Sequence, residues 1–175
     1  RPIDPSPDQP LNPPLGPPLE AGLYIVATPI GNLGDITQRA RETLRSVSAI
    51  ACEDTRVTGK LLQHLGIRQK LIRYDDHASE ATRDHLLQIA AREPLALVSD
   101  AGTPLISDPG YKLVRDVTAH DLAVHALPGA SSVLAALCVA ALPTDRFFFD
   151  GFLPNKQTAR RARLAHHDRK HGNTG

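Results

Sequence analysis

Short apolar runs alternate with stretches of helical length along most of this chain. The runs are rich in leucine and branched side chains, as strands covered on both faces of a sheet are. Such strand and helix units imply right-handed crossovers, so we expect an α/β fold: a mostly parallel five-stranded sheet with helices on both faces. The expected strands are 23–28, 49–53, 71–74, 95–99 and 123–127, and the expected helices are 35–47, 55–65, 79–91, 108–119 and 130–142.

Single residues predict some helix ends and the burial of the last expected helix. Asp35 and Ser79 are expected N-caps, because their side-chain oxygens can accept hydrogen bonds from free backbone N–H groups. Gly66 is expected to end the second helix, since glycine adopts the left-handed conformation there without strain. The most apolar segment, 130–142, is shorter than the about 20 residues that a membrane span needs. We therefore expect a buried helix there and no membrane partner.

Composition narrows the class of protein. A length of 175 residues with 41% apolar content allows one ordinary core. The net charge of +1 argues against a general polyanion binder, so any nucleic-acid contact should be local, and no DNA partner is expected. Cys52 and Cys138 are isolated from each other and from any metal-ligand spacing, so neither a metal site nor a disulfide is expected. Together with the lack of a secretion signal pattern, this favours a reduced, cytoplasmic protein.

The two ends of the chain differ from residues 21–146, which we expect to form one α/β cofactor-binding domain. Residues 1–18 hold eight of the fifteen prolines, so we expect 1–20 to be a disordered leader; a docking segment is the alternative. Residues 147–175 are expected to be a linker and a basic tail, which either touches phosphates or is a solvated terminus. The chain starts with Arg1 and has no Met, so we expect that residues are missing in front.

The segment 95–110, reading LALVSDAGTPLISDPG, is the strongest candidate for a ligand site. An expected strand runs into a loop of small, acidic and turn-forming residues, which includes Asp100 and Asp108. Ligands of open α/β sheets bind at the carboxyl ends of the strands. Two more strand exits, PIGNLGDIT at 29–37 and PGASS at 128–132, offer glycine turns and free helix N-termini. These exits should converge on one edge, although a purely structural turn is the alternative for 29–37.

Charged residues follow the second and third expected strands. The second strand ends in CEDTR, which brings Glu53, Asp54 and Arg56 together. These residues could take part in catalysis, or Asp54 could cap the next helix while Arg56 pairs with a neighbouring acid. The third exit, 74–77, reads YDDH and has the same two explanations.

The segments TPIGNLGDIT, IACEDTR, LVSDAGTPLISDPG, ALPGASS and FFFDGFLP together resemble the tetrapyrrole methylase superfamily. Within that superfamily they look like the branch that methylates small-subunit ribosomal RNA. The resemblance covers about residues 23–156, in family order and with family-like spacing. The spacing of the glycines fits neither a dinucleotide nor a triphosphate loop, so it does not favour a dehydrogenase.

This resemblance implies a reaction, a cofactor and a set of residues. It implies methyl transfer from S-adenosylmethionine to the ribose 2′-hydroxyl of a cytidine in the decoding region of 16S rRNA, within the small ribosomal subunit and without a metal. A neutral hydroxyl needs a nearby proton acceptor, and Asp54, Glu53 and Asp100 are the carboxylates available at strand exits. Asp54 is the expected catalytic residue, and Glu53 is the second candidate. Arg56 and Lys60 could hold phosphates or be ordinary exposed charges. The cofactor would lie against Pro29, Gly31, Asn32, Gly34, Asp35, Ser99, Asp100, Ala101, Gly102, Thr103, Pro104, Pro128, Gly129, Ala130 and Ser131.

The resemblance covers only the N-terminal domain of that family. The family's second domain, which forms the other half of its cofactor cleft, is absent from 147–175, so we expect weak cofactor binding and poor methylation by this truncated chain. A homodimer is expected of the full-length form. One alternative is a methyltransferase of corrin or sirohaem biosynthesis, although NLGDIT at 32–37 favours the RNA branch. Another is a non-catalytic fragment that acts through association.

Overall fold

The computed structural model describes residues 18–75 and 77–171, with side chains of the last helix described through His166. The leader expected at 1–20 lies almost wholly outside the described residues. The chain divides into two compact units, one ending at Val139 and the other beginning at Ala140, and each is described by itself.

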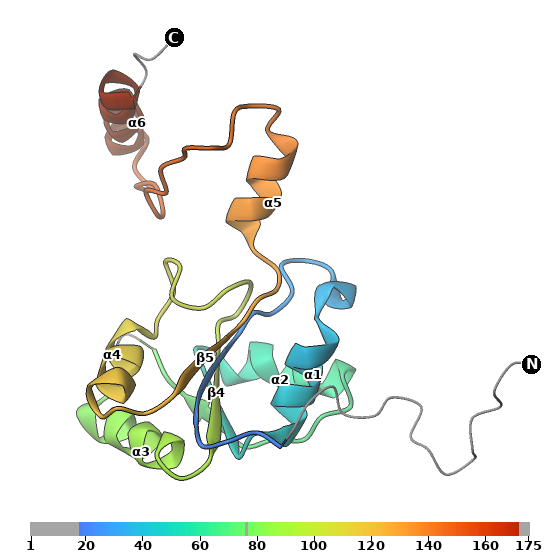
Figure 1. The fold of residues 1–175 in the computed structure, drawn as a ribbon. Helices are drawn as coiled ribbons and strands as arrows, with labels where there is room; N and C mark the ends of the chain where they lie inside the picture. The colour runs from blue at the N-terminus through green and yellow to red at the C-terminus, as the bar shows by residue number, and fades with distance from the viewer. Residues whose placement is uncertain (1–17, 76, 172–175) are drawn as a thin grey trace, which may run out of the picture. The chain divides into compact units, whose positions relative to one another are not determined.

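The first unit is built on a parallel sheet, which confirms the predicted α/β fold (Figure 1). Every pairing between neighbouring strands is parallel, and the strand order is β3-β2-β4-β1-β5. β1 and β2 are buried along their whole length, and β4 is buried after its first residue, because helices cover both faces. The strands are β1 (Gly22–Val26), β2 (Ala49–Cys52), β3 (Leu71–Arg73), β4 (Pro94–Val98) and β5 (Val124–Leu127).

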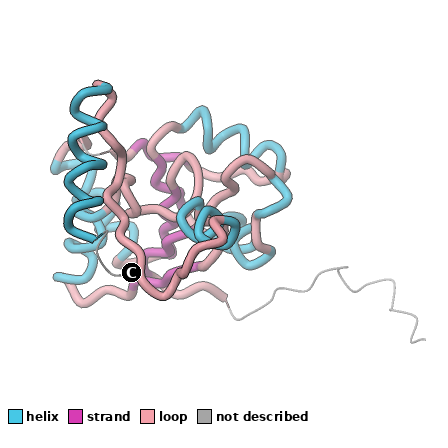
Figure 2. The backbone as a smooth tube through the Cα atoms, turned by 90° about the horizontal axis from the view of Figure 1, so that it is seen from above, coloured by secondary structure: helices cyan, strands magenta, loops and turns pink. Residues whose placement is uncertain are grey.

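Four helices form the outer layers of this sandwich. α1 (Gln38–Ser46) and α2 (Thr55–His64) cover one face, where Leu44 and Leu62 pack against side chains from the strands. α3 (Glu80–Ala90) and α4 (Tyr111–Ala119) cover the other face through Leu86 and Leu113. The tube view in Figure 2 shows helices on both sides of the strands. The sheet alternates its side chains between these two cores, as a doubly covered sheet requires.

Two of the three predicted helix ends are confirmed. Ser79 accepts a hydrogen bond from the N–H of Thr82 at 3.1 Å, and Gly66 follows α2 with a φ of +65°. The prediction that Asp35 caps α1 is wrong, because Asp35 ends a short 3-10 helix, η1 (Leu33–Asp35). The chain then takes an extended step, so the cap is Thr37, whose hydroxyl accepts from Ala40 N–H.

The expected buried helix at 130–142 is shorter and exposed, which corrects that prediction. α5 (Ser132–Val139) has no buried residue, and Leu134 and Val139 are 57% and 82% exposed. Figure 1 shows α5 extending away from the carboxyl edge of the sheet instead of lying against a face. Apolar side chains lie on all sides of α5, so its sequence predicts burial. The four helices α1 to α4 already cover both faces of the sheet, so no face is left for α5.

The second unit contains α6 (Gln157–His171), which the sequence did not predict. Its described side chains are exposed, and Arg163 forms an ion pair with Asp150, seven residues before the helix begins. None of the described helices combines the length and apolar character needed to cross a membrane.

Candidate functional site

Three strand exits are held together at the carboxyl edge of the sheet. Thr28, just after β1, pairs with Gly102 in the loop after β4: the Thr28 N–H donates to the Gly102 carbonyl at 2.9 Å, and the Gly102 N–H donates back at 3.0 Å. The Thr28 hydroxyl also donates to the carbonyl of Ser99 at 3.2 Å. Thr28 and Ser99 are buried, so these bonds are shielded from water and fix the two exits to each other.

The exit of β5 joins the same arrangement. The hydroxyl of Thr103 donates to the carbonyl of Ala130 at 3.1 Å. Gly129 packs so closely on the first exit that a Cβ added to it would lie 2.9 Å from the Cβ of Ala27. A side chain at 129 would therefore force the loops apart. We call these three exits, residues 27–35, 99–110 and 128–131, the small-residue edge.

The loop after β4 has an unusual backbone. Gly102 and Gly110 have φ values of +85° and +134°, and two residues with side chains, Leu105 and Ser107, also have positive φ, at 76° and 61°. Such conformations cost about 1–3 kcal/mol each for residues with side chains and persist only where surrounding contacts enforce them. Pro104 is fully buried, and the side chains of Leu97 and Leu105 lie 2.8 and 2.9 Å from the Cβ position of Gly110, so the loop is packed against the protein. The loop therefore has a fixed, strained shape beside the edge of the sheet.

The loop after β1 is the exposed part of the small-residue edge. Its residues from Ile30 to Asp35 are solvent-exposed, and the Asn32 side chain accepts the N–H of Gly34 at 2.9 Å. Gly31 has a φ of +138° and open space around its Cβ position. The turn is therefore held by its own backbone, with free surface above it.

The sequence places Asp108 in the loop after an expected strand, but Asp108 is not among the expected cofactor contacts. Partial burial raises the pKa of Asp108 above its ordinary value, and the nearby charge of Asp100 adds to this, while a hydrogen bond from Ser99 opposes it. The residue lies in the strained loop that the small-residue edge shares. Its chemistry could have been predicted only with the burial that the fold creates.

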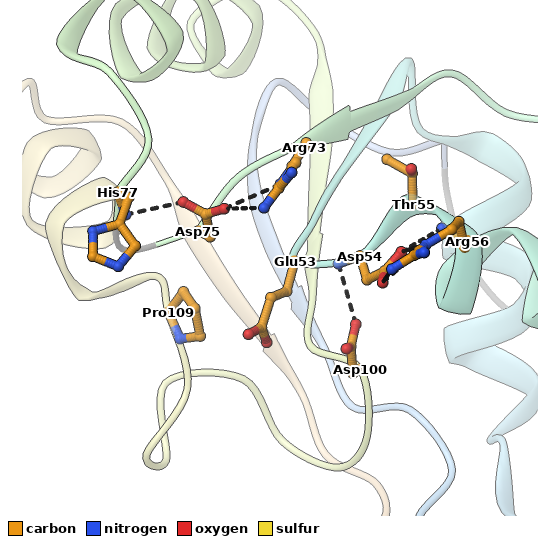
Figure 3. Close-up of a pocket in the computed structure, with 9 residues that line it drawn as sticks. All are labelled: Glu53, Asp54, Thr55, Arg56, Arg73, Asp75, His77, Asp100 and Pro109. Atoms are coloured by element: carbon orange, nitrogen blue, oxygen red, sulfur yellow. Dashed lines mark hydrogen bonds and ion pairs between the residues drawn. The ribbon is translucent and has the colours of Figure 1, made fainter.

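A second feature, which we call the charged pocket, lies where β2, β3 and β4 end. Its volume is about 650 Å³. Figure 3 shows Glu53 between two ion pairs, Asp54 with Arg56 and Asp75 with Arg73. The pocket is lined by Glu53, Asp54, Thr55, Arg56, Arg73, Asp75, His77, Asp100 and Pro109.

Asp54 takes the capping role that the sequence left open. It is the N-cap of α2 and accepts the Arg56 N–H at 2.8 Å, and its carboxylate pairs with the Arg56 guanidinium at 2.6 Å. These hydrogen bonds from Arg56 hold the pKa of Asp54 well below its ordinary range. The Asp54 N–H in turn donates to the Asp100 carboxylate at 3.2 Å, which links the exits of β2 and β4.

The exit of β3 has a similar local arrangement. Arg73 pairs with Asp75 at 3.0 Å, and the other oxygen of Asp75 accepts the N–H of His77 at 2.9 Å. Asp76 lies outside the described residues. Of the YDDH segment, Asp75 and His77 thus line the charged pocket, Tyr74 is buried in the core, and Asp75 also has the turn-capping role expected of an exposed loop.

The structure divides the expected site residues into two groups. The expected cofactor contacts lie in the loops that follow β4, β1 and β5, which are neighbours in the sheet, whereas Glu53 and Asp54 follow β2 on the other side of β4. Asp100 belongs to both groups, because it follows β4 and lines the charged pocket. Among the described residues, no group of three or more His, Cys, Asp or Glu side chains is arranged to hold a metal ion.

Comparison of the sequence with known proteins finds close relatives over one half of their length. The chain is 60% identical over 147 residues to "Ribosomal RNA small subunit methyltransferase I" of Erythrobacter litoralis, which covers 84% of this chain and 52% of the relative. It is 52% identical over 145 residues to the protein of the same name from Xylella fastidiosa, covering 82% and 53%. The chain thus spans about half the length of the curated relatives it matches.

Comparison with solved structures agrees at the level of the fold. A cobalt precorrin-4 methyltransferase of cobalamin biosynthesis superposes with a TM-score of 0.57 at 16% identity, over 85% of this chain and 66% of that one. A uroporphyrin-III C-methyltransferase from Thermus thermophilus superposes with a TM-score of 0.52 at 21% identity, over 71% and 53%. The family profile described as tetrapyrrole (corrin/porphyrin) methylases matches residues 22–173. On its sequence, its sheet and its loops, this chain belongs to the tetrapyrrole methylase family.

Proposed function

We propose that this protein takes part in S-adenosylmethionine-dependent methylation of RNA, at the ribose 2′-hydroxyl of a cytidine in the decoding region of 16S rRNA. The names of relatives at 52% and 60% identity support the RNA substrate. One structural observation supports the cofactor most directly: three strand exits with small residues are bonded to one another at the carboxyl edge of the sheet. That edge is where ligands of such sheets bind.

The small-residue edge has the shape that a cofactor bed needs. Gly129 lies against Ala27 with no space for a Cβ, and a Cβ at Gly102 would approach Ile30 to 3.3 Å, so the loops lie close together. The residues from Ile30 to Asp35 above them are solvent-exposed, so a ligand can reach the backbone of this turn. We assign cofactor contact to the residues expected from the sequence, at positions 29, 31, 32, 34, 35, 99–104 and 128–131.

The charge of this edge also suits the cofactor. S-adenosylmethionine supplies an activated methyl group on a positively charged sulfur, and it has a cationic amino group. Asp100 and Asp108 bring two carboxyl groups to the loop that the edge and the charged pocket share. In a partly buried site, their negative charge favours a cation over a neutral or anionic ligand.

We assign the acceptor ribose to the charged pocket, with Glu53 and Asp54 as the catalytic candidates. Asp54 is already bound to Arg56 and its pKa is low, so it is a poor proton acceptor. Glu53, which lines the same pocket, takes the proton from the 2′-hydroxyl as the oxygen attacks the methyl carbon, while Asp54 holds Arg56 in place. Positioning and proton acceptance suffice, since the methyl group is already activated. Arg56 and Lys60 would contact phosphates beside the pocket.

The same proposal extends to partners and location. The substrate would be 16S rRNA within the small ribosomal subunit, which puts the protein in the cytoplasm. A homodimer is proposed for the full-length form. A second candidate function, association through an apolar surface, is favoured by one observation, the exposure of α5 with Leu134 and Val139. The third candidate, methylation of a tetrapyrrole, rests on solved structures whose likeness extends to the fold alone.

The proposed reaction is tested by incubating the protein with S-adenosylmethionine labelled in its methyl group and with small ribosomal subunits that lack this methylation. We expect label in 16S rRNA, at a rate below that of the Erythrobacter litoralis relative. The rate of a Glu53→Gln variant should be at least about tenfold lower, because a general base contributes at least that much to the rate. Label on a tetrapyrrole but not on RNA would contradict the proposal, as would an unchanged rate for Glu53→Gln.

A further inference from the structure

Positive charge in this chain is concentrated in one short segment. Residues 156–171 contain six Lys and Arg residues and one Asp, a net charge of +5 with His neutral. The whole chain has a net charge of +1, so the remaining residues have a net charge of −4. This segment is almost wholly the helix α6. A local excess of this size produces a positive potential that a chain-wide average hides.

The helix arranges its basic side chains in two roles. Arg163 donates two hydrogen bonds to the carboxylate of Asp150, at 2.6 and 2.7 Å, and this fork-like pair connects the helix to the segment before it. Asp150 raises the pKa of Arg163 further. Arg163 is therefore already paired with a carboxylate, and its role is to position α6 against the segment before it.

Three other basic residues, Lys156 directly before α6 and Arg160 and Arg161 on it, are available to an anion from outside. Lys156, Arg160 and Arg161 are exposed, and none of them is ion-paired with a carboxylate among the described residues. The Arg160 N–H bonds to the Lys156 carbonyl at 2.9 Å, so the helical repeat begins at Lys156 and brings its side chain beside that of Arg160. Several exposed cations on one short segment favour a polyanion over a single small anion, because the affinity for nucleic acid grows with the number of phosphates neutralised.

We propose that α6 is the surface through which this protein contacts the phosphate backbone of its RNA, with Lys156, Arg160 and Arg161 as the contacting residues. The inference rests on the proposed function, because that function makes RNA the polyanion the protein meets. The contacts are to phosphates, so they add affinity and orientation without reading the base sequence. Arg163 and Asp150 hold the helix in place.

The test is binding of a fluorescently labelled single-stranded RNA of about 20 nucleotides, measured by anisotropy at several salt concentrations. The triple variant Lys156→Ala, Arg160→Ala, Arg161→Ala should bind at least about tenfold more weakly near 0.1 M salt. Its slope of log affinity against log salt should be smaller by about 2, since three lost single-strand contacts each contribute about 0.7. The matched control, Arg41→Ala, Arg92→Ala, Lys112→Ala, removes equal charge from exposed positions in the first unit.

Each outcome decides the proposal. Loss in the α6 variant with a nearly unchanged control supports it, provided that circular dichroism shows the same helix content. Equal losses in both variants, no loss in either, or no RNA binding by the parent chain overturn it. Binding to vesicles of anionic phospholipid but not to RNA also overturns it. Titration of the parent chain with S-adenosylmethionine in parallel separates the two proposals. A parent chain that does not bind the cofactor contradicts the proposed function. A triple variant that binds RNA as well as the parent does contradicts only this inference.

Discussion

The two sides of the carboxyl edge are built in different ways. On the small-residue edge, backbone groups and buried hydroxyls connect the loops, as in the pairing of Thr28 with Gly102. In the charged pocket, exposed side chains make the connections: Arg56 and Arg73 are 86% and 75% exposed in their ion pairs. One side has a shape fixed by the main chain, and the other has a charge pattern made by exposed ion pairs.

This difference separates rigidity from chemistry. A cofactor that is the same in every turnover suits a bed whose shape is part of the fold, and changes there should cost stability. A larger substrate suits a pocket of exposed ion pairs, because such pairs contribute little to stability and can exchange partners. We therefore expect substitutions on the small-residue edge to affect folding and those in the charged pocket to affect mainly reaction rate.

The largest effect on stability is expected at Gly110. A Cβ there would lie 2.8 Å from Leu97 and 2.9 Å from Leu105, and the φ of +134° is unfavourable for any side chain. We expect Gly110→Ala to lower the free energy of unfolding by about 3 kcal/mol, from overpacking and backbone strain together. Gly31→Ala is the matched control, because its φ of +138° is nearly the same and its surroundings are open.

The control should lose only the strain, about 1 kcal/mol. Urea denaturation of both variants measures the difference. Equal losses at the two positions would show that packing against the loop after β4 adds nothing, and the small-residue edge would then be less rigid than we describe.

A smaller loss is expected from Thr103→Val, which removes the hydrogen bond to the Ala130 carbonyl and leaves that carbonyl without its partner. We expect about 1 kcal/mol in the free energy of unfolding. Thr118→Val is the control, because the Thr118 hydroxyl bonds to the Val114 carbonyl on the exposed side of α4. If the two valine variants unfold at the same urea concentration, the contact between the exits of β4 and β5 has no special weight.

The two sides should also respond to pH with opposite sign. Hydrogen bonds from Arg56 lower the pKa of Asp54 below 3.8, so this carboxylate stabilises the fold above about pH 4 and the contribution is lost as pH falls. Burial raises the pKa of Asp108 above 3.8, so its ionised form opposes folding at neutral pH, and the penalty disappears as pH falls through the raised value.

Asp54→Asn and Asp108→Asn isolate these contributions, and asparagine caps a helix about as well as aspartate does. At pH 7 the first variant should melt at a lower temperature than the parent and the second at a higher one. Both differences should shrink as the pH is lowered to 3. Melting curves at pH 3 and pH 7 check this, and a lower melting temperature for Asp108→Asn at pH 7 would contradict it.

The smallest change in stability is expected from Arg73→Ala. Arg73 is exposed, and Asp75 keeps its hydrogen bond from His77 without it. The free energy of unfolding should change by less than about 0.5 kcal/mol. Methyl transfer to RNA should nevertheless fall, whereas Arg92→Ala, an exposed control, should leave it unchanged. A marked loss of stability would place Arg73 with the rigid side.

The elements of the sheet could be predicted, but their order could not. Apolar runs such as 95–99 identify strands within one or two residues, because burial on both faces leaves a continuous apolar run. The order β3-β2-β4-β1-β5 depends on contacts between distant segments, which no local pattern contains. The sequence therefore predicts a single site where all the strand exits meet. In the structure, Glu53 and Asp54 lie on the opposite side of β4 from the loop that follows β1.

Local competition explains the remaining errors. Asp35 and Thr37 are both capable caps, and the choice depended on η1, a turn that the glycines around Asn32 permit. α5 is apolar on every side, so its sequence predicts burial without saying against what. Ser79 was predicted correctly because one good cap precedes a clear helix and has no rival nearby.

The central claim is that the small-residue edge binds S-adenosylmethionine while the charged pocket does not. Calorimetric titration of this chain, of Gly129→Ala and of Glu53→Gln tests it directly, with urea denaturation to show that each variant is folded. The account predicts saturable binding by the parent and by Glu53→Gln, and at least about tenfold weaker binding by Gly129→Ala, whose Cβ would lie 2.9 Å from Ala27. No binding by the parent, or binding lost in Glu53→Gln but kept in Gly129→Ala, would contradict it.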